Sequence, residues 1–383
     1  MKSFIIIGAN LTGLCTALAL SKINQPSILI DRNDISIPIN TDGRAIALSY
    51  GSKQILEEIG IWDKLLPYTG TIAEIRVTDQ YSPLFLHFDN SSTLGYLIES
   101  HDLQRIFYEM AVQDPNVTIL SNSQYELLDN NHEEAIVRVN DIIYKTDLLI
   151  AADGKFSNLR KLCKIKYLQH NYQQTAIVCK VKHQDLHNNI AQEIFLPNGP
   201  FAILPLKDQH QSGIVWTETP EVAKSLTEMT LEKFNYFLNE KFNGYLGDIA
   251  LISNISSYPL ELVIAEQYYH NHIMLIGDSA HSIHPISGQG FNLGLRDIDA
   301  LTQIYKKFAK LGLVMGCYQS LEEYQKQRMS DNVSMAIITD SLNKLFSNNI
   351  MPINILRKLG LHIVNQLPSL QKFFMEYAMA KKE

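Results

Sequence analysis

Four short, unbroken runs of apolar residues stand at widely separated places in the chain. They are residues 4–7, 27–30, 148–151 and 273–276. Runs of this length without polar alternation are typical of parallel strands that are buried on both faces. Apolar side chains recur at helical spacing after the first run and again from Asn292 onward, which predicts two helices. The pattern therefore predicts an α/β fold built around a parallel sheet.

Two segments between these runs, 71–99 and 166–269, instead show strand-like alternation and turn residues. Within the second segment, residues 193–204 predict two strands joined by a turn. We expect both segments to form one mostly antiparallel sheet, as a second domain inserted into the first. Residues 336–383 are predicted to form a C-terminal helical segment. The first domain would then be discontinuous and consist of residues 1–70, 100–165 and 270–335.

A loop with two glycines follows the first apolar run, and an acid follows the second. Gly8 and Gly13 bracket the loop, and Asp31 lies eighteen residues past Gly13. In a Rossmann-like nucleotide site the first glycine permits a tight turn, and the last lets helix and strand pack closely. The helix N-terminus then faces a pyrophosphate, and the acid accepts the ribose hydroxyls. The arrangement predicts dinucleotide binding.

Asn10 stands where the usual pattern has a middle glycine. Because Asn tolerates left-handed backbone angles better than most residues, we expect the loop to survive this replacement. Two alternatives are a plain βαβ unit without a ligand and a signal peptide within residues 1–20. Cleavage after Ala19 would remove the glycine loop and separate it from the rest of the site, which favours the nucleotide interpretation.

A second acid, Asp278, closely follows the fourth apolar run, and a loop with Pro285, Gly288 and Gly290 comes after it. The helix predicted from Asn292 would offer free N–H groups and the positive end of its dipole. FAD carries a ribityl chain as well as a ribose, so two acids at strand ends favour FAD over NAD. The alternatives are a structural loop without a ligand and a metal site.

The metal alternative rests on Asp278, His281 and His284, which recur at three-residue spacing. They fall in a predicted loop rather than on one face of a helix, so no metal is assigned. The third apolar run is followed by Asp153 and Gly154, a pair that on its own is typical of a simple turn.

The composition disfavours several classes of protein, among them nucleic-acid-binding and disulfide-rich proteins. Lys and Arg number 33 against 40 Asp and Glu, a net charge of −7, which disfavours nucleic-acid binding. The four cysteines form no C-x-x-C pair, which argues against a disulfide framework or a zinc ribbon and favours a reducing, cytoplasmic location. They are Cys15, Cys163, Cys179 and Cys317.

Taken in order, these sites resemble the FAD-dependent aromatic-ring monooxygenases of the p-hydroxybenzoate hydroxylase-like class. In particular, the chain resembles the ubiquinone-biosynthesis hydroxylase family. The resemblance covers most of residues 1–345 and is strongest in residues 276–294, which run from Gly277-Asp278 through the Pro285 loop to Gly294. The other stretches that carry it are the glycine loop with Asp31, residues 42–49 and residues 150–154.

The resemblance implies that Asp31 and Arg32 bind the adenosine end of FAD. It places Asp153 and Gly154 near the pyrophosphate. The residues of the first loop implied to contact the cofactor are Gly8, Asn10, Leu11, Thr12 and Gly13.

It further implies that Asp278 binds the ribityl-phosphate region and that Arg44 and Arg105 contact the cofactor. The residues alone favour simpler interpretations for the two arginines. Arg44 would be a surface loop cation, and Arg105 would form a helix-surface ion pair with Asp102 or Glu109.

By the same resemblance, residues 285–293 surround the isoalloxazine ring. Pro285 would shield the flavin edge that reacts with oxygen, and no side chain is assigned as a catalytic base. The N–H groups of Asn292 and Leu293 would lie at a flavin carbonyl. The remaining predicted contacts in this segment are Gly288, Gln289, Gly290 and Phe291.

The implied reaction is hydroxylation of a (poly)prenylated phenol in ubiquinone biosynthesis, with O2 and a flavin C4a-hydroperoxide. No second nucleotide loop is visible, so the electron donor is either NAD(P)H bound transiently or an external reductase. One alternative is a hydroxylase of a small soluble aromatic acid. Residues 190–205 contain no Lys or Arg to clamp such an acid. Another alternative is a flavin-bound accessory subunit of a quinone-biosynthesis complex with little activity of its own.

Residues 341–383 hold six Lys and Arg against two Glu, a balance of +4, together with many apolar residues. They are expected either to pack as helices on the first domain or to form an amphipathic patch that touches an anionic membrane or a partner. The second case would place a cytoplasmic protein peripherally on the inner face of the membrane, within reach of a hydrophobic phenolic substrate.

Overall fold

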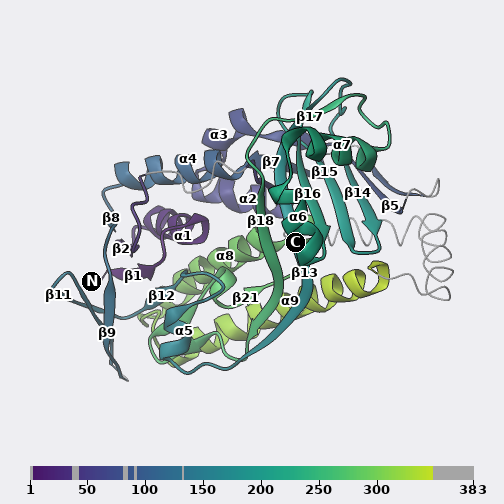
Figure 1. Ribbon diagram of the computed structural model, residues 1–383. Helices are drawn as coiled ribbons and strands as arrows, with labels where there is room; N and C mark the ends of the chain where they lie inside the picture. Colours follow the sequence, from purple (N-terminus) through teal and green to yellow (C-terminus); the bar gives the residue numbers. More distant parts are fainter. Residues whose placement is uncertain (1–2, 37–42, 81–84, 90–92, 132, 348–383) are drawn as a thin grey trace.

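The computed structural model describes residues 3–36, 43–80, 85–89, 93–131 and 133–347 (Figure 1). The four predicted buried strands lie in one six-stranded sheet, in the order β19-β20-β12-β1-β2-β8. All neighbours pair in parallel except β19, which runs antiparallel to β20. The strands are β1 Phe4–Ile7, β2 Ser27–Ile30, β8 Val117–Leu120, β12 Leu149–Ala151, β19 Tyr269–His270 and β20 Ile273–Leu275.

Helices pack against this sheet and enclose the main apolar core. Helix α1 contacts β2 and also packs on α4 and α8, and α8 packs on α9. Strand β1 and most of α1 are buried in this core, so the apolar N-terminal run is an integral part of the fold. The helices are α1 Leu11–Lys22, α2 Tyr50–Ile59, α3 Trp62–Leu65, α4 Ser100–Gln113, α5 Asn158–Leu162, α8 Gly290–Lys310 and α9 Tyr318–Phe346, with 3-10 turns η1 Leu66–Tyr68, η2 Gly277–Ser279 and η3 Ile286–Gly288.

A large sheet forms the other side of the molecule (Figure 1). Its order is β21-β18-β13-β16-β15-β14-β5-β6, and β17 pairs with β13 at one end. Apolar side chains of helices α6 and α7 pack on one face, and on the other face Phe195 packs with Ile286 and with Phe346 of α9. The elements are β5 Glu74–Asp79, β6 Phe85–Asp89, β13 Tyr167–His183, β14 Ile190–Leu196, β15 Gly199–Pro205, β16 Gln211–Glu218, β17 Ile249–Leu251, β18 Ser256–Ala265, β21 His281–Ser282, α6 Pro220–Glu228 and α7 Leu231–Phe242.

This large sheet confirms the predicted inserted, mostly antiparallel sheet, with two corrections. Strands β5 and β14 pair in parallel, because the connection between them passes through the first domain. In addition, residues 71–99 divide between two sheets, since β7 pairs with β3 and β4 rather than with the large sheet. The two small sheets are β3 Ala45–Ser49, β7 Gly95–Glu99 and β4 Gly70–Ile72, and β9 Tyr125–Asn130, β10 Ala135–Val139 and β11 Ile142–Thr146.

The predicted C-terminal helical segment is described only in its first part. Residues 336–346 continue helix α9, which runs along the lower side of the molecule to the end of the large sheet in Figure 1. Residues 348–383, which carry most of the predicted basic patch, lie outside the described residues. None of the helices within the described ranges combines the length and the apolar character needed to cross a membrane.

Candidate functional site

The glycine loop between β1 and α1 is packed so closely that two positions accept no side chain. Gly8 has a φ of +100°, and a Cβ there would lie 2.4 Å from the carbonyl oxygen of Ala152. A Cβ at Gly13 would lie 1.8 Å from the carbonyl oxygen of Gly8. These contacts are the tight turn and the close helix–strand approach that the sequence predicts for the two glycines.

Asn10 has a different role from the one predicted. Its φ is −84°, so the backbone is extended and its tolerance of left-handed angles is not used. Its side chain instead caps α1, because the carboxamide oxygen accepts the Leu11 N–H at 2.8 Å. The N–H groups of Thr12 and Gly13, in the first turn, have no acceptor within the helix. An N-terminus of this kind is suited to bind an anion.

Asp31 lies just past the C-terminal end of β2 and is bonded to the glycine loop. Its Oδ2 accepts the Ala9 N–H at 2.7 Å, and its Oδ1 accepts the Asn33 N–H at 2.9 Å. Each carboxylate oxygen can accept a second hydrogen bond, so both remain able to bind hydroxyls. The neighbouring Arg32 is exposed.

The Asp153 segment is tied to the Asp278 loop by an arginine that sequence reasoning missed. Asp153 Oδ2 accepts the N–H groups of Asn158 and Leu159, and its buried Oδ1 has no donor among the described residues. Arg160 is buried and donates to the carbonyl of Ser279 at 2.6 Å. An arginine with local helical signals shortly after Asp-Gly is the signal that could have identified it.

Asp278 and Arg44 approach each other although they are far apart in the sequence. Asp278 lies in η2 and is exposed on one side, whereas protein surrounds the rest of it. Desolvation raises the pKa of Asp278, and the charges of His281, Arg44 and Lys155 oppose this rise. The Arg44 guanidinium donates to Ser100 Oγ at 3.1 Å and lies 5.7 Å from the centre of the Tyr258 ring.

A buried carboxylate, Asp297, holds the loop before Asp278 in place. Its Oδ2 accepts the Gly277 N–H at 2.9 Å and lies 2.5 Å from His281 Nε2. Arg328 of α9 donates to its Oδ1 at 2.7 Å. Burial alone would raise the pKa of Asp297, but the charges of His281 and Arg328 lower it below its usual range. Sequence reasoning missed this residue, whose signal is an acid within the apolar pattern of the predicted helix.

The two histidines proposed as metal ligands contact other side chains instead. His281 faces Asp297, and His284 Nε2 lies 3.1 Å from the Gln174 carboxamide oxygen. Within the described ranges, no group of three His, Cys, Asp or Glu side chains is arranged to hold a metal ion.

Helix α8 begins at Gly290, two residues before the predicted start. The Leu293 N–H therefore donates to the Gln289 carbonyl at 3.0 Å, which corrects the expectation that this group is a free donor. The Asn292 side chain acts as a clamp instead. It donates to the carbonyls of Ala47 and Gly288, and it accepts from the Ser49 N–H and the Ser52 hydroxyl.

Arg105 makes the ion pairs of the simpler interpretation. It lies on α4, where its guanidinium donates to Asp102 at 2.9 Å and to Glu109 at 3.2 Å, and it sits 5.0 Å from the centre of the Tyr68 ring. A contact between Arg105 and a cofactor stays a prediction.

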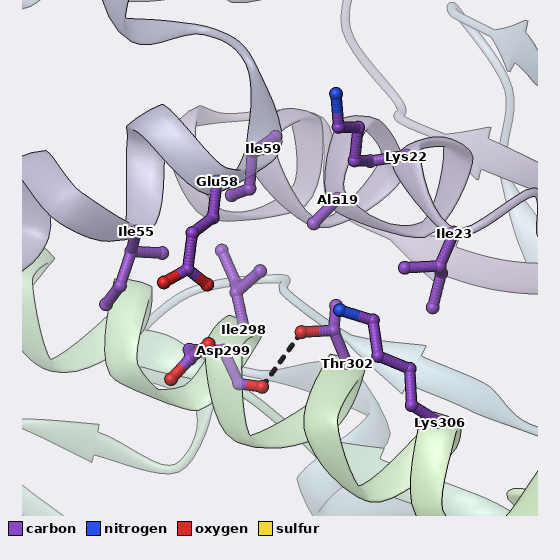
Figure 2. Close-up of a pocket in the computed structure, with 10 residues that line it drawn as sticks. All are labelled: Ala19, Lys22, Ile23, Ile55, Glu58, Ile59, Ile298, Asp299, Thr302 and Lys306. Carbon is purple, nitrogen blue, oxygen red and sulfur yellow. Dashed lines mark hydrogen bonds between the residues drawn. The ribbon is translucent and has the colours of Figure 1, made fainter. Parts of the chain in front are cut away.

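The described part of the chain has a small cavity and an open cleft near the elements of the candidate site, and they differ in volume and in lining. Figure 2 shows a cavity of about 30 Å³ between α1, α2 and α8, about the space of one water. None of the predicted site residues lines it. An open cleft of about 580 Å³ lies beside the segment that carries Arg44, and a Lys180–Glu99 ion pair of 3.0 Å crosses its lining. This cleft is lined by Gly43, Glu99, His101, Lys180, Leu251, Ile252, Ser253 and Asn254.

The residues at the strand ends fit FAD. The α1 N-terminus suits a pyrophosphate, Asp31 suits a ribose and Asp278 suits the hydroxyls of a ribityl chain. At Gly154 and Gly290 a Cβ would meet no atom within 4 Å, so the backbone borders open space that a ligand could approach closely. Gly288 by contrast packs on Ala47, since its Cβ would come within 2.9 Å of the Ala47 Cβ.

Comparison with known proteins agrees with this fit. The family model described as FAD binding domain matches residues 2–335. The chain is 35% identical to ubiquinone hydroxylase UbiL of Rhodospirillum rubrum over 98% of this chain and 89% of that protein. It is 32% identical to ubiquinone hydroxylase UbiM of Neisseria meningitidis, over 97% of this chain and 83% of the relative.

Among solved structures, p-nitrophenol 4-monooxygenase PnpA of Pseudomonas putida has the same fold. Its TM-score is 0.82 at 15% sequence identity, over 100% of this chain and 99% of that one. The family match spans the glycine loop, the Asp153 segment and the Asp278 loop alike. The chain is therefore a member of the FAD-binding domain family, and FAD is its cofactor.

Proposed function

We propose that this protein is an FAD-dependent monooxygenase that hydroxylates the ring of a prenylated phenol in ubiquinone biosynthesis. The observation that carries the proposal is the near full-length similarity to two proteins named ubiquinone hydroxylases, each covering at least 97% of this chain. The geometry supports it, because Ile286, next to Pro285, packs on the apolar side chain of Phe195 in the large sheet.

Bound FAD, once reduced, would supply the activation of O2, from which one oxygen atom is transferred to the ring. The chain's own residues would bind the cofactor through the α1 N-terminus, Asp31 and Asp278. Arg44 would add positive charge beside Asp278. The closely packed Asn292 clamp and the apolar face of the large sheet would keep water from the reacting ring.

An apolar ring substrate suits this site better than a small aromatic acid. Strands β14 and β15, which form the middle of the facing sheet, carry no Lys or Arg within residues 190–205. A carboxylate substrate would need a cation there to offset its desolvation. Hydroxylation of a small aromatic acid is therefore the less favoured activity.

The electrons are proposed to come from NAD(P)H that binds briefly or from a separate reductase, since the chain has one glycine loop of this type. Peripheral attachment to a membrane or to a quinone-biosynthesis complex is likewise proposed, because it would bring the site to a hydrophobic substrate. The basic C-terminal residues invoked for this attachment, among them Arg357, Lys358 and Lys372, lie outside the described residues.

The test is to profile quinone intermediates in a strain that lacks this gene. We expect one prenylated phenol, short of a single hydroxyl group, to accumulate and to disappear when the parent gene is returned. The matched control returns the gene for Asp278→Ala, which should restore little of the hydroxylated product and leave the prenylated phenol accumulated. An unchanged profile in the deletion strain would contradict the proposed substrate class.

A further inference from the structure

Glu193 belongs to a row of five paired residues on five neighbouring strands of the large sheet, and the other four residues of this row are apolar. The register places it opposite Val77 of β5 on one side and Ala202 of β15 on the other. The row continues through the next two strands with apolar residues only. Its members, from β5 to β13, are Val77, Glu193, Ala202, Val215 and Val178.

The neighbours of Glu193 on β14 show which way its face of the sheet is turned. Because side chains alternate along a strand, Ala191 and Phe195 share its face, whereas Ile194 packs in the core beneath α6 and α7. Phe195 packs with Ile286 and stacks on Phe346 of α9 at 4.2 Å between ring centres. Glu193 therefore belongs to the face that is turned toward the Pro285 segment.

The contacts of Ala191, on the other side of Glu193 along β14, also connect this face to the residues beside Pro285. Ala191 lies in the apolar cluster that Ala47 of β3 packs against. Ala47 in turn touches Gly288, where a Cβ would come within 2.9 Å of it. The two flanking clusters thus contact β3 and residues 286–288, and the latter belong to the segment 285–293 that is expected to surround the isoalloxazine ring. Glu193 lies between these two clusters on the sheet that covers them.

The Glu193 carboxyl is unusual for its surroundings. Among the described residues it makes no side-chain hydrogen bond and no ion pair, although most of its surface is covered. Desolvation alone raises its pKa to about 7. An unpaired carboxyl in an apolar row costs stability, so packing gives no reason to have it there. A carboxyl with this pKa is suited to exchange a proton near neutral pH.

We propose that Glu193 accepts the proton of the substrate's ring hydroxyl, an inference that rests on the proposed function. The O–H bond of the phenol breaks as a new O–H bond forms on the Glu193 carboxylate, and nothing is oxidised or reduced in this step. The phenolate oxygen then donates electron density to the ring carbon that receives oxygen. The proton returns to the product's oxygen when the carboxyl is regenerated as carboxylate.

The direct test uses ortho-prenyl-para-nitrophenol, whose absorption reports whether the bound phenol is ionised. The FAD-loaded parent, Glu193→Gln and the exposed-site control Glu126→Gln are titrated near pH 7 under anaerobic conditions. We expect the parent and the control to bind the probe largely as phenolate and Glu193→Gln to bind it as neutral phenol. Equal ionisation in Glu193→Gln and the parent would overturn the assignment.

The same titration separates this inference from the proposed function. If the parent does not bind the nitrophenol at all, the phenol-binding site itself is wrong and Glu193 has no such role. If the parent binds and hydroxylates prenylphenol, Glu193→Gln should lower the coupled rate about 100-fold, as expected for loss of a general base. Its FAD content should remain that of the parent.

A second variant tests whether a lower activity of Glu193→Gln comes from a damaged fold rather than from the loss of the base. Glu193→Leu should raise the melting temperature, because it removes an unpaired carboxyl from an apolar row, and it should still lose coupled hydroxylation. The hydroxylation rate of the parent should rise with pH near 7, and that of Glu193→Gln should not.

Other charged groups face this region from the sheet and from the opposite side. They are Asp79 and Lys180 on the sheet and Arg44 and Asp278 opposite it, and none of them contributes to the raised pKa of Glu193. A Glu193→Leu variant that hydroxylates like the parent would refute the proposal.

Discussion

Asp297 and His281 form a fully buried pair, 2.5 Å apart, directly behind the loop that carries Asp278. The same carboxylate oxygen accepts the Gly277 N–H, so the pair fixes the backbone just before Asp278. Arg328 adds a second buried partner from α9. The loop that carries Asp278 is thus anchored to the last described helix by charge rather than by apolar packing alone.

Replacing Asp297 should therefore destabilise the protein strongly. Asp297→Asn removes the buried carboxylate that both His281 and Arg328 face, and Arg328 keeps only its pair with Asp331 among the described carboxylates. Removing one member of a buried ion pair typically costs about 3–5 kcal/mol. The measurement is the free energy of unfolding in urea. Glu323→Gln, which removes an exposed ion pair with Lys307, is the matched control and should change stability by about 1 kcal/mol or less. Equal effects of the two substitutions would contradict the anchoring role.

The two strand-end acids should respond differently to two flavins. Asp278→Ala should weaken FAD binding about 10- to 100-fold, because charge-assisted hydrogen bonds contribute about 1.5–3 kcal/mol. It should weaken FMN binding as well, since FMN keeps the ribityl chain. Asp31→Ala should weaken FAD binding only, because FMN lacks the adenosine ribose. Fluorescence titration of both variants with both flavins measures this, and equal loss of FMN binding in Asp31→Ala would contradict its placement.

Substitutions at two glycines should distinguish an effect on the stability of the fold from an effect on FAD binding. Gly13→Ala should destabilise the protein by several kcal/mol, since its Cβ would overlap the Gly8 carbonyl. Gly290→Ala meets no atom within 4 Å and should leave the apo-protein as stable or slightly more stable, because Ala favours a helix. It should nevertheless weaken FAD binding if the cofactor lies against this backbone. Unfolding and FAD titration of both variants test this, and unchanged FAD affinity in Gly290→Ala would remove that contact.

Acid should unfold the protein partly through His284. Burial lowers the pKa of His284 to about 4, below its ordinary value of 6.5. The unfolded chain therefore binds this proton more readily, so the stability is fully present above about pH 6.5 and is lost as the pH falls toward 4. The loss approaches about 3 kcal/mol, since one pKa unit corresponds to about 1.4 kcal/mol.

The check is the melting temperature between pH 7.5 and 4.5 for the parent and His284→Gln. The variant should lose less stability over this range than the parent. Desolvation also lowers the pKa values of His183 and His187 and acts in the same direction, so both proteins should keep some acid sensitivity. Parallel curves would show that His284 does not titrate as described.

Local patterns explain what could be predicted from the sequence. A buried strand, a glycine turn and a following acid are neighbours in the chain, so the ends of β1, β2, β12 and β20 were all predictable. The contacts that hold the site together join distant segments. Arg160 reaches Ser279, and the side chain of Asn292 reaches Ser49, through packing that no local period encodes.

The backbone conformation of single residues and the register of the strands also could not be predicted from the sequence. Asn10 has a spacing that suggests a left-handed turn, but its side chain caps α1 with an extended backbone. In the sequence Glu193 resembles an ordinary polar residue of a strand, and only the pairing of five strands shows that the other residues of its row are apolar. Register depends on partners far away in the chain, so the sequence pattern alone does not reveal it.

The most direct test of the central claim is oxygen incorporation by the purified FAD-loaded protein. The protein is reduced chemically, mixed with ortho-prenylphenol and exposed to O2 that carries only the heavy isotope of oxygen, and the product is weighed by mass spectrometry. The account predicts a hydroxylated ring that contains one labelled oxygen atom, at a yield that falls sharply in Asp278→Ala unless FAD is added in large excess. Peroxide formation with no labelled product from the parent would contradict it.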